Sequence, residues 1–184
     1  MSGATKRRVF LAVGLDGETR HLLAACLADH LEMAPSWKPV RPEDWHVTLR
    51  FLGWSTEVQR DLVMMYLADQ LTASPFVARL EGLGAFPKPR KATVLWMGVD
   101  VADRLAPLAA ASESAAIAAG FAPDDRPYHA HLTLARIRPQ ADVRGLVEEF
   151  DSCGVRFDVN AVTMYESFVE PGGTRYEPID TLPL

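Results

Sequence analysis

The sequence is poor in cysteine and has no excess of positive charge, and each shortage argues against a class of protein. Its 184 residues contain only Cys26 and Cys153, one in an apolar helical pattern and one in the turn-like segment DSCG. Two cysteines do not make a disulfide framework, so we expect both to be reduced. The net charge of -5 opposes a protein that grips long stretches of nucleic-acid backbone, because such binding needs many Lys and Arg side chains against phosphates. A small anionic ligand is compatible with this charge.

The chain also has no long hydrophobic run. Its basic start, MSGATKRRVFLAV, contains a short apolar stretch that soon reaches Asp16, so it predicts neither a signal peptide nor a membrane span. No low-complexity segment or long linker divides the sequence. With 48% apolar and 23% charged residues, we expect a single domain over residues 1–184 that is built from two lobes. The sequence therefore predicts a cytoplasmic enzyme or binding module.

Hydrophobic periodicity predicts that strands and helices alternate along the chain. Strands are expected over residues 9–15, 46–53, 76–86, 92–99, 129–137 and 159–170, the last of which turns through residues 171–173 into 174–179, and helices over residues 16–33, 55–72, 102–119 and 142–150. Asp16 is expected to cap the first helix, and Thr56 with Gln59 resembles a capping box for the second. Gly120 is placed to end the third helix, whereas Pro107 favours a later start for it.

One short motif occurs twice. HVTLRFLG at residues 46–53 and HAHLTLARI at residues 129–137 both contain His-x-Thr-Leu, and 85 residues separate His46 from His131. The same offset aligns RPEDWHVTL with RPYHAHLTL without gaps. From the Thr and Leu content, two such motifs among five histidines would arise by chance about a few times in ten thousand. The sequence therefore predicts an internal duplication in which each half is strand, helix, strand.

Strand geometry places the polar residues of both motifs on one face. Successive side chains of a strand point to opposite faces, so His46 and Thr48 share a face, as do His131 and Thr133. The alternating Val and Leu residues point to a core. If the halves meet about a pseudo-twofold axis, two imidazoles and two hydroxyls converge on one cleft.

Two histidines in one cleft suit acid-base chemistry on a small anion. The ordinary histidine pKa of about 6.5 lets one imidazole act as a base while the other holds a proton as an acid. A phosphodiester displacement needs both groups, one for the nucleophile and one for the leaving oxygen. The two threonine hydroxyls would bind the non-bridging oxygens, and nothing in this scheme requires a metal.

With this duplicated motif, the chain resembles the two-histidine (2H) phosphoesterase superfamily, whose signature is a duplicated His-x-Thr/Ser-x. Within it, the chain is similar to the RNA 2′,3′-cyclic phosphodiesterase family, also called 2′-5′ RNA ligases (LigT-like). The likeness covers the opening RVFLAV, the first motif WHVTLRFLG, the central GAFPKPRKATVLWMGV, the second motif HAHLTLAR and the closing YESFVEPGGTRYEPI. The paired motifs are specific, and each flanking segment alone is weak.

The resemblance implies a duplicated, bilobal α/β (α+β) fold with two antiparallel sheets, flanked by helices, around a central cleft. It implies that His46 and His131 are catalytic, that Thr48 and Thr133 contact the phosphate, and that Arg136 helps to hold the nucleotide. The implied reaction is metal-independent hydrolysis of RNA or nucleoside 2′,3′-cyclic phosphate ends to 2′-phosphates, with reversible 2′-5′ ligation as a second activity. We expect a monomer that requires no metal, no other cofactor, no membrane and no obligate protein partner.

Two other readings stay open. His129 and His131 form His-x-His on one strand, and His46 would supply a third nitrogen to a zinc-dependent hydrolase. That reading leaves the two threonines without a role. A non-catalytic module that binds an RNA end or a nucleotide would use the same cleft, and it would not need both His-x-Thr motifs to be intact.

Overall fold

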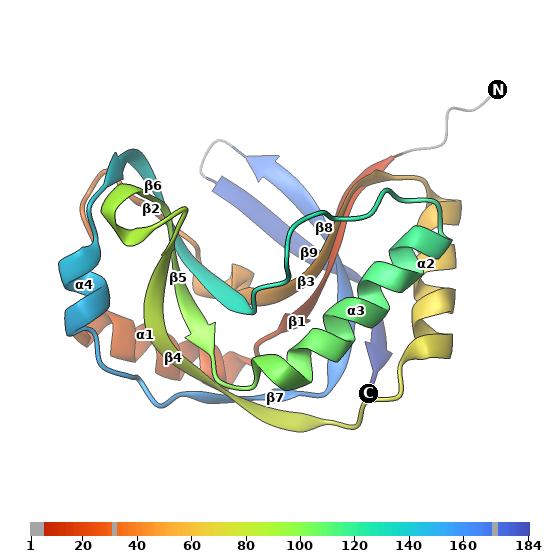
Figure 1. Cartoon of the computed structure of the whole chain (residues 1–184), viewed down its shortest axis with the longest axis horizontal. Coiled ribbons are helices and arrows are strands. Elements are labelled where there is room, and N and C mark those ends of the chain that lie inside the picture. Colours follow the sequence, from red (N-terminus) through yellow and green to blue (C-terminus); the bar gives the residue numbers. More distant parts are fainter. Residues whose placement is uncertain (1–5, 31–32, 171–172) are drawn as a thin grey trace.

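One curled antiparallel sheet carries the helices on its outer side (Figure 1). The computed structural model describes residues 6–30, 33–170 and 173–184. The helices are α1 (Gly17–His30), α2 (Glu57–Gln70), α3 (Ala102–Ala118) and α4 (Arg144–Glu149), with the short 3-10 turns η1 (Pro42–Asp44) and η2 (Pro89–Lys91). The strands are β1 (Arg7–Gly14), β2 (Lys38–Pro39), β3 (His46–Ser55), β4 (Phe76–Phe86), β5 (Ala92–Val99), β6 (His131–Ala141), β7 (Arg156–Val159), β8 (Ala161–Glu170) and β9 (Gly173–Pro183). The α/β (α+β) prediction is confirmed.

The two halves of the sheet meet at one residue pair. The strand order is β7-β4-β5-β6-β3-β1-β8-β9, and β2 pairs with β6. Between β6 and β3 the only register pair among the described residues is Val47 with Leu132. The two sheets implied by the resemblance are therefore halves of one continuous sheet that bends at this junction.

The repeat predicted from the sequence is visible in the order of the elements. β1, α1 and β3 in the first half correspond to β5, α3 and β6 in the second. The two helices begin at Gly17 and Ala102 and the two motif strands at His46 and His131, so both pairs keep the offset of 85 residues. The pseudo-twofold axis itself stays a prediction.

Three of the predicted helix ends agree with the structure, and the end expected for the first helix near Met33 follows residues 31–32, which lie outside the described residues. The Asp16 carboxylate accepts a hydrogen bond from the backbone N–H of Thr19 at 2.8 Å, and Thr56 forms the expected capping box with Gln59. Gly120 follows α3 with a φ of +88°, which favours glycine. The later start expected for α3 is wrong, because this helix begins at Ala102 and includes Pro107.

The cysteine prediction is also wrong. Cys26 on α1 and Cys153 in the loop before β7 form a disulfide, with their Cα atoms 5.9 Å apart. They are 127 residues apart in the sequence, so their proximity follows from tertiary packing rather than from any local pattern. Within the described ranges, none of the helices has the length and apolar character needed to cross a membrane.

Candidate active site

The junction between β3 and β6 brings the two motifs together. Val47 and Leu132 are fully buried where the strands pair, which fixes the opposite face as the polar one. The antiparallel register about this pair places His46 beside Thr133 and Thr48 beside His131 on that polar face. All four of these side chains are half-buried. The face predicted from strand alternation is therefore shared by both motifs in the fold.

Both imidazoles are held in the same way. Nδ1 of His46 lies 2.7 Å from the carbonyl oxygen of Asp44, and Nδ1 of His131 lies 2.7 Å from that of His129. A carbonyl only accepts hydrogen bonds, so Nδ1 of each ring carries a proton and donates it. The remaining ring nitrogen, Nε2, is left to exchange a proton with a ligand, because it is an acceptor when the ring is neutral and a donor when the ring is protonated.

Aromatic side chains surround each histidine. The ring of His46 lies 4.7 Å from that of Phe10 and 4.9 Å from that of Tyr176, while the ring of His131 lies 5.0 Å from that of Phe86. Across the sheet, His46 pairs with Gly14 and His131 pairs with Gly98. A Cβ at Gly14 would lie 2.4 Å from the Tyr165 hydroxyl. A side chain at this position would therefore displace an aromatic wall of the site.

This apolar environment depresses the basicity of both rings. Burial lowers the pKa of His46 to about 4, against a smaller opposing effect of the hydrogen bond to Asp44. Burial also lowers the pKa of His131 from its ordinary value. The charge of His131 contributes to the lowered pKa of His46, so the two imidazoles are close enough to interact. In the absence of a ligand, His46 is neutral at pH 7.

A bulge follows each motif and changes which residue returns to the polar face. On β3 the register passes from Thr48 to Arg50, and on β6 it passes from Thr133 to Ala135. Arg50 and Ala135 are consequently buried, whereas the next residue in each strand is exposed. Arg136 on β6 and its counterpart Phe51 on β3 thus share a face with the histidines.

Phe51 differs in exposure from the neighbouring Phe10. Phe10, which stacks against Phe51 with 6.4 Å between ring centroids, is only 2% exposed and belongs to the wall of the site. Phe51 is 38% exposed, and the guanidinium of Arg8 lies 4.8 Å from its ring centroid. Of the two rings, only Phe51 offers a surface to a ligand.

Arg50 has a structural role that sequence reasoning did not predict. Its guanidinium donates to the carbonyl oxygens of Phe51 and Ala122 and forms an ion pair with Glu113 of α3. These contacts tie β3 to α3 and to the segment that leads into β6. Arg50 is therefore buried, and its guanidinium is held by groups of the protein itself.

Asp44 is a positioning residue that sequence reasoning missed. Its side chain is buried, and its carboxylate accepts hydrogen bonds from Nε of Arg41 at 2.8 Å and from the backbone N–H of Tyr176 at 3.0 Å. Its carbonyl holds His46. The only sequence signal was an acidic residue two positions before the histidine. In the second half His129 occupies the equivalent position, because only a backbone carbonyl is needed there.

His46, His129 and His131, the ligands of the zinc-site hypothesis, are not arranged to hold a metal ion. The rings of His129 and His131 are 6.0 Å apart, and His129 packs edge-on against Trp96 with 4.8 Å between ring centroids. Across the described part of the chain, no group of three His, Cys, Asp or Glu side chains is arranged to hold a metal ion.

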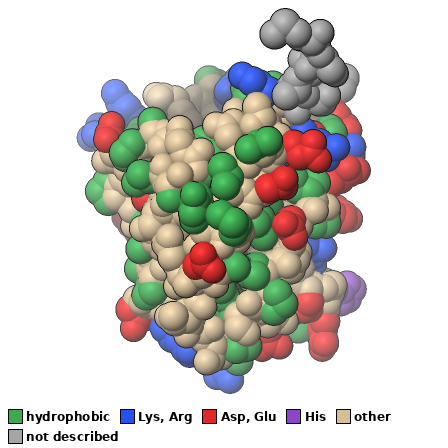
Figure 2. All heavy atoms as spheres, turned by 90° about the vertical axis from the view of Figure 1, so that its right-hand side faces the viewer, with side chains coloured by type: hydrophobic (Ala, Val, Ile, Leu, Met, Phe, Trp, Pro, Cys, Tyr) green, Lys and Arg blue, Asp and Glu red, His purple; other side chains and the backbone are tan. Residues whose placement is uncertain are grey.

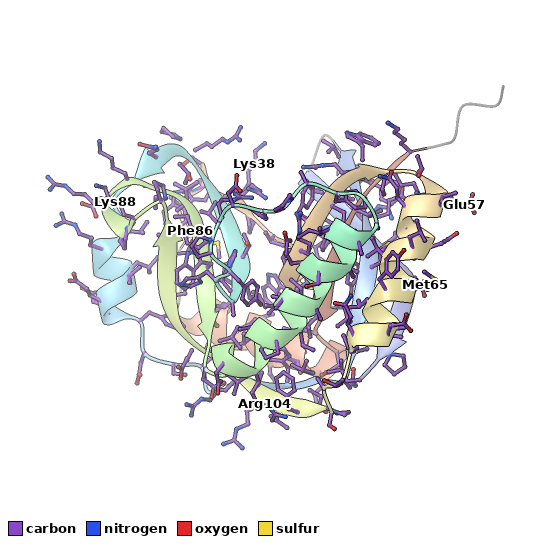
Figure 3. The ribbon with its side chains drawn as sticks, turned by 45° about the vertical axis from the view of Figure 1, so that its right-hand side comes forward. Lys38, Glu57, Met65, Phe86, Lys88 and Arg104 are labelled. Carbon is purple, nitrogen blue, oxygen red and sulfur yellow. A yellow bond between two sulfur atoms is a disulfide. The ribbon has the colours of Figure 1, made fainter. Side chains whose placement is uncertain are left out.

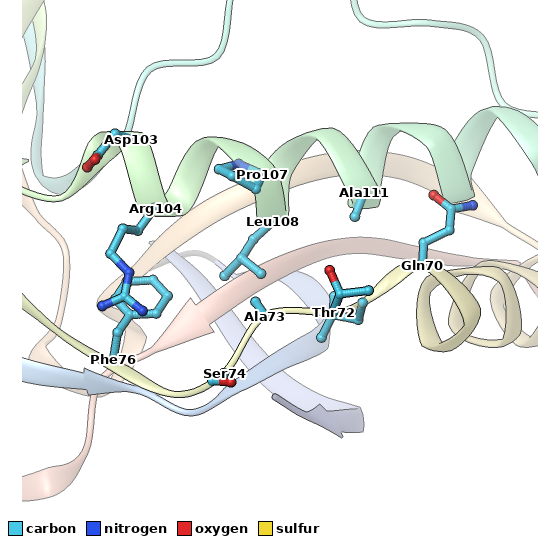
Figure 4. Close-up of a pocket in the computed structure, with 11 residues that line it drawn as sticks. Gln70, Thr72, Ala73, Ser74, Phe76, Asp103, Arg104, Pro107, Leu108 and Ala111 are labelled. Carbon is cyan, nitrogen blue, oxygen red and sulfur yellow. The ribbon is translucent and has the colours of Figure 1, made fainter.

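Two other surface features lie away from the histidines. A hollow of about 310 Å³ lies between the end of α2, the start of β4 and α3, where the Arg104 guanidinium is 4.1 Å from the Phe76 ring centroid (Figure 4). On the side of the molecule that carries α2, apolar side chains gather beside acidic ones (Figure 2), and Val58 and Met65 are exposed there. Neither feature contains a His-x-Thr residue.

The sequence matches a known family in two segments. The family described as LigT like Phosphoesterase matches residues 13–96 and 99–176, and each segment contains one His-x-Thr motif. A protein of Archaeoglobus fulgidus named RNA 2′,3′-cyclic phosphodiesterase is 31% identical over 174 residues, which cover 94% of this chain and 97% of that protein. A protein of the same name from Methanothermobacter thermautotrophicus is 31% identical over 185 residues, which cover 97% of this chain and 100% of the relative.

Solved structures have the same fold. The crystal structure of Escherichia coli LigT complexed with 3′-AMP superposes with a TM-score of 0.78 at 26% identity, covering 98% of this chain and 99% of that chain. A crystal structure of a protein from Thermus thermophilus gives a TM-score of 0.78 at 26% identity and covers 96% of this chain and 97% of that one.

Proposed function

The chain belongs to the LigT-like phosphoesterase family, and on this premise we propose that it hydrolyses 2′,3′-cyclic phosphate ends of RNA or nucleosides to 2′-phosphates. The observation that carries the proposal is the paired geometry of His46 and His131. Each ring donates its Nδ1 proton to a backbone carbonyl, and each stands on the polar face of the same strand junction. The names of the relatives support the substrate class.

The proposed reaction uses one histidine as a base and the other as an acid. Nε2 of His131 takes a proton from water as the water oxygen attacks phosphorus, and the bond from phosphorus to the 3′ oxygen breaks. Nε2 of His46 gives its proton to that oxygen, which leaves a 3′ hydroxyl and a 2′-phosphate. The histidines then exchange protons with solvent to restore the starting state. This assignment of roles rests on the family resemblance, because the two motifs are nearly symmetric.

The acid role requires His46 to gain a proton when the substrate binds. Burial holds its pKa at about 4 in the free protein, so it is neutral at pH 7. A bound phosphodiester brings a negative charge next to the ring, and an opposite charge favours the protonated imidazole. We propose that substrate binding and protonation of His46 are coupled.

Four side chains are proposed to bind the rest of the substrate's reacting end. Thr48 and Thr133 flank the histidines, and their hydroxyls would donate to the non-bridging phosphate oxygens as charge develops. Phe51 is proposed to stack the terminal base, since its exposed ring lies on the same face. Arg136, which is exposed on the same face, is the proposed cationic contact.

The same centre is compatible with reversible 2′-5′ ligation. A 5′ hydroxyl of a second RNA would take the place of water, the base would deprotonate it, and the 3′ oxygen would leave as before. We propose this as a second activity of a monomeric protein that needs no cofactor. A cytoplasmic location also stays a proposal, and the disulfide between Cys26 and Cys153 is unusual for a reducing compartment.

A turnover assay tests the proposed function. The protein is incubated with a nucleoside 2′,3′-cyclic phosphate in the presence of EDTA, and the products are separated by chromatography. We expect the 2′-phosphate as the only product and a rate that EDTA does not change. A protein that binds the nucleotide and leaves it intact would be a binding module, and activity that EDTA abolishes and zinc restores would support the zinc-dependent reading.

A further inference from the structure

A basic pocket adjoins the candidate active site. Its volume is about 230 Å³, and it lies between β2, β6 and the β8–β9 hairpin. Residues from all of these segments line it, among them Lys38, Arg41, Arg136, Glu170, Arg175 and Tyr176. In Figure 3, Lys38 lies at the upper edge of the molecule, well separated from Lys88.

Tyr176 connects this pocket with the catalytic histidine. Its ring lines the pocket and also packs edge-on against His46, with 4.9 Å between ring centroids. Asp44, whose carbonyl holds His46, lines the pocket as well. The Tyr176 ring therefore contacts both the pocket and His46, the proposed acid.

Two of the four cations in the pocket are neutralised by the protein itself. Arg41 pairs with the buried carboxylate of Asp44 at 2.8 Å, and Arg175 pairs with Glu170 at 3.0 Å and also with Glu177. These contacts hold the walls of the pocket together and leave little of either charge for a ligand.

Lys38 and Arg136 are the two cations of the pocket that no carboxylate of the described residues neutralises. They are register partners across β2 and β6, so their side chains start from opposite points of neighbouring strands. Both are exposed, and among the described residues neither forms an ion pair with a carboxylate. Like charges that face each other in this way destabilise a strand pair. A bound anion between them would relieve the repulsion.

We propose that this pocket binds the phosphodiester immediately 5′ to the reacting nucleotide of an RNA substrate, with Lys38 and Arg136 as its cationic contacts. The inference rests on the proposed function. A nucleoside 2′,3′-cyclic phosphate carries one anionic group, which the histidines and threonines would occupy. From a 3′-terminal cyclic phosphate the chain continues only in the 5′ direction, so the next anion along the RNA is this phosphodiester. The pocket would thus favour RNA ends over mononucleotides.

The test compares three substrates that share one reacting end. They are a nucleoside 2′,3′-cyclic phosphate, a dinucleotide with the same cyclic end, and that dinucleotide with an uncharged methylphosphonate linkage. We expect the charged dinucleotide to have the highest kcat/KM. Replacing Lys38 by Ala should reduce the ratio of kcat/KM for the charged dinucleotide to that for the mononucleotide about 10-fold, the lower end for a hydrogen bond to a charged group. With the methylphosphonate, K38A should show no such selective loss.

Lys91→Ala is the matched control, because Lys91 is also exposed and its replacement changes the net charge equally. It should keep the substrate ratio. An equal loss of the ratio in K91A would indicate a general electrostatic effect and overturn the pocket. The pocket is overturned as well if K38A slows all three substrates alike, or if the wild type does not distinguish the charged linkage from the neutral one.

Failure of the proposed function would look different. A wild-type protein that turns over none of the three substrates would contradict the hydrolase itself. Binding of a dinucleotide that ends in a 2′-phosphate, compared with its methylphosphonate analogue, then decides the pocket. Tighter binding of the charged compound that is lost in K38A and kept in K91A supports the pocket, and equal binding overturns it.

Discussion

At the residue scale, the proposed role of His46 as the acid depends on its ionisation. Its hydrogen bond to Asp44 fixes the ring, and the surrounding rings of Phe10 and Tyr176 shield it partly from water. Desolvation disfavours the charged form of an imidazole, which is why the pKa of His46 falls to about 4. An acid with this pKa is useful at neutral pH only when an anionic substrate is bound beside it.

The pH dependence of catalysis should show this coupling. The pKa values of both His46 and His131 lie below 6.5 in the free protein, and the active form of the pair carries one proton. Because kcat/KM reports the free enzyme, we expect it to be highest below pH 6.5 and to fall as the pH rises further. The maximum of kcat should lie at a higher pH, since the bound phosphate favours the imidazolium. Profiles of both parameters between pH 4 and 9 measure this, and a kcat/KM that stays constant up to pH 8 would contradict it.

The sequence predicted which histidines share a face, but not what surrounds them. His46, Thr48, His131 and Thr133 follow from strand alternation, which is a local property. Tyr176 comes from a strand that follows His46 by more than a hundred residues, and nothing in its own neighbourhood indicates that it packs on the imidazole. Contacts between distant segments of this kind are fixed by the fold.

At the scale of elements, the bulges in β3 and β6 determine what accompanies the histidines. Strict alternation would place Arg50 and Ala135 on the polar face. The register shifts bury these two residues and expose Phe51 and Arg136 instead. Alternation alone could not predict this outcome, because a bulge depends on how the strand pairs with its neighbours. Arg136 was expected to contact the nucleotide only through the family resemblance.

Replacing Phe51 tests the consequence of the first bulge. Phe51→Ala removes the ring proposed to stack the base, and base stacking on an aromatic side chain contributes about 1–3 kcal/mol. We therefore expect KM for a nucleoside 2′,3′-cyclic phosphate to rise roughly 5- to 150-fold while kcat changes little. Phe51→Tyr keeps the ring and is the control, with an unchanged KM. If kcat falls and KM is constant, Phe51 supports the histidines and does not bind the base.

Helix α3 shows how packing overrides a local signal. Proline inside a helix costs about 3 kcal/mol, which favoured a start after Pro107. The helix nevertheless begins at Ala102, and Leu105 and Leu108, on either side of the proline, are both buried in the core. Burial of each leucine contributes about 1.5–3 kcal/mol, enough to offset the cost of the proline.

At the scale of the whole molecule, the disulfide joins segments from the two halves of the chain. Cys26 lies on α1 in the first half and Cys153 just before β7 in the second. The cysteine count gave no reason to expect this bond, because it depends on how the halves fold against each other. The order of the four helices and of the longer strands was predictable, since it follows from periodicity within short segments, whereas the short strands β2 and β7 were not expected.

Loss of the disulfide should lower the stability of the folded chain. A crosslink between residues 127 positions apart restricts the unfolded state, and its removal typically costs about 2–4 kcal/mol. We expect reduction, or the double replacement Cys26→Ser and Cys153→Ser, to lower Tm by roughly 4–16 °C. Thermal unfolding with and without reductant measures this, and the double variant should not respond to reductant. Equal Tm values for oxidised and reduced wild type would show that the bond adds no stability.

In the proposed reaction one histidine is the acid and the other is the base, and the leaving group separates the two roles. The rates of His46→Ala and His131→Ala are compared on a nucleoside 2′,3′-cyclic phosphate and on a nitrophenyl phosphodiester that the wild type accepts. A ribose oxygen needs a proton as it leaves, whereas a nitrophenolate does not.

On the cyclic phosphate both variants should lose a factor of about 10² to 10⁴. On the nitrophenyl ester, His46→Ala should regain most of its rate, because the acid is no longer needed, and His131→Ala should stay slow. The opposite pattern would exchange the two roles. Equal defects of both variants on both substrates would contradict a division into one acid and one base.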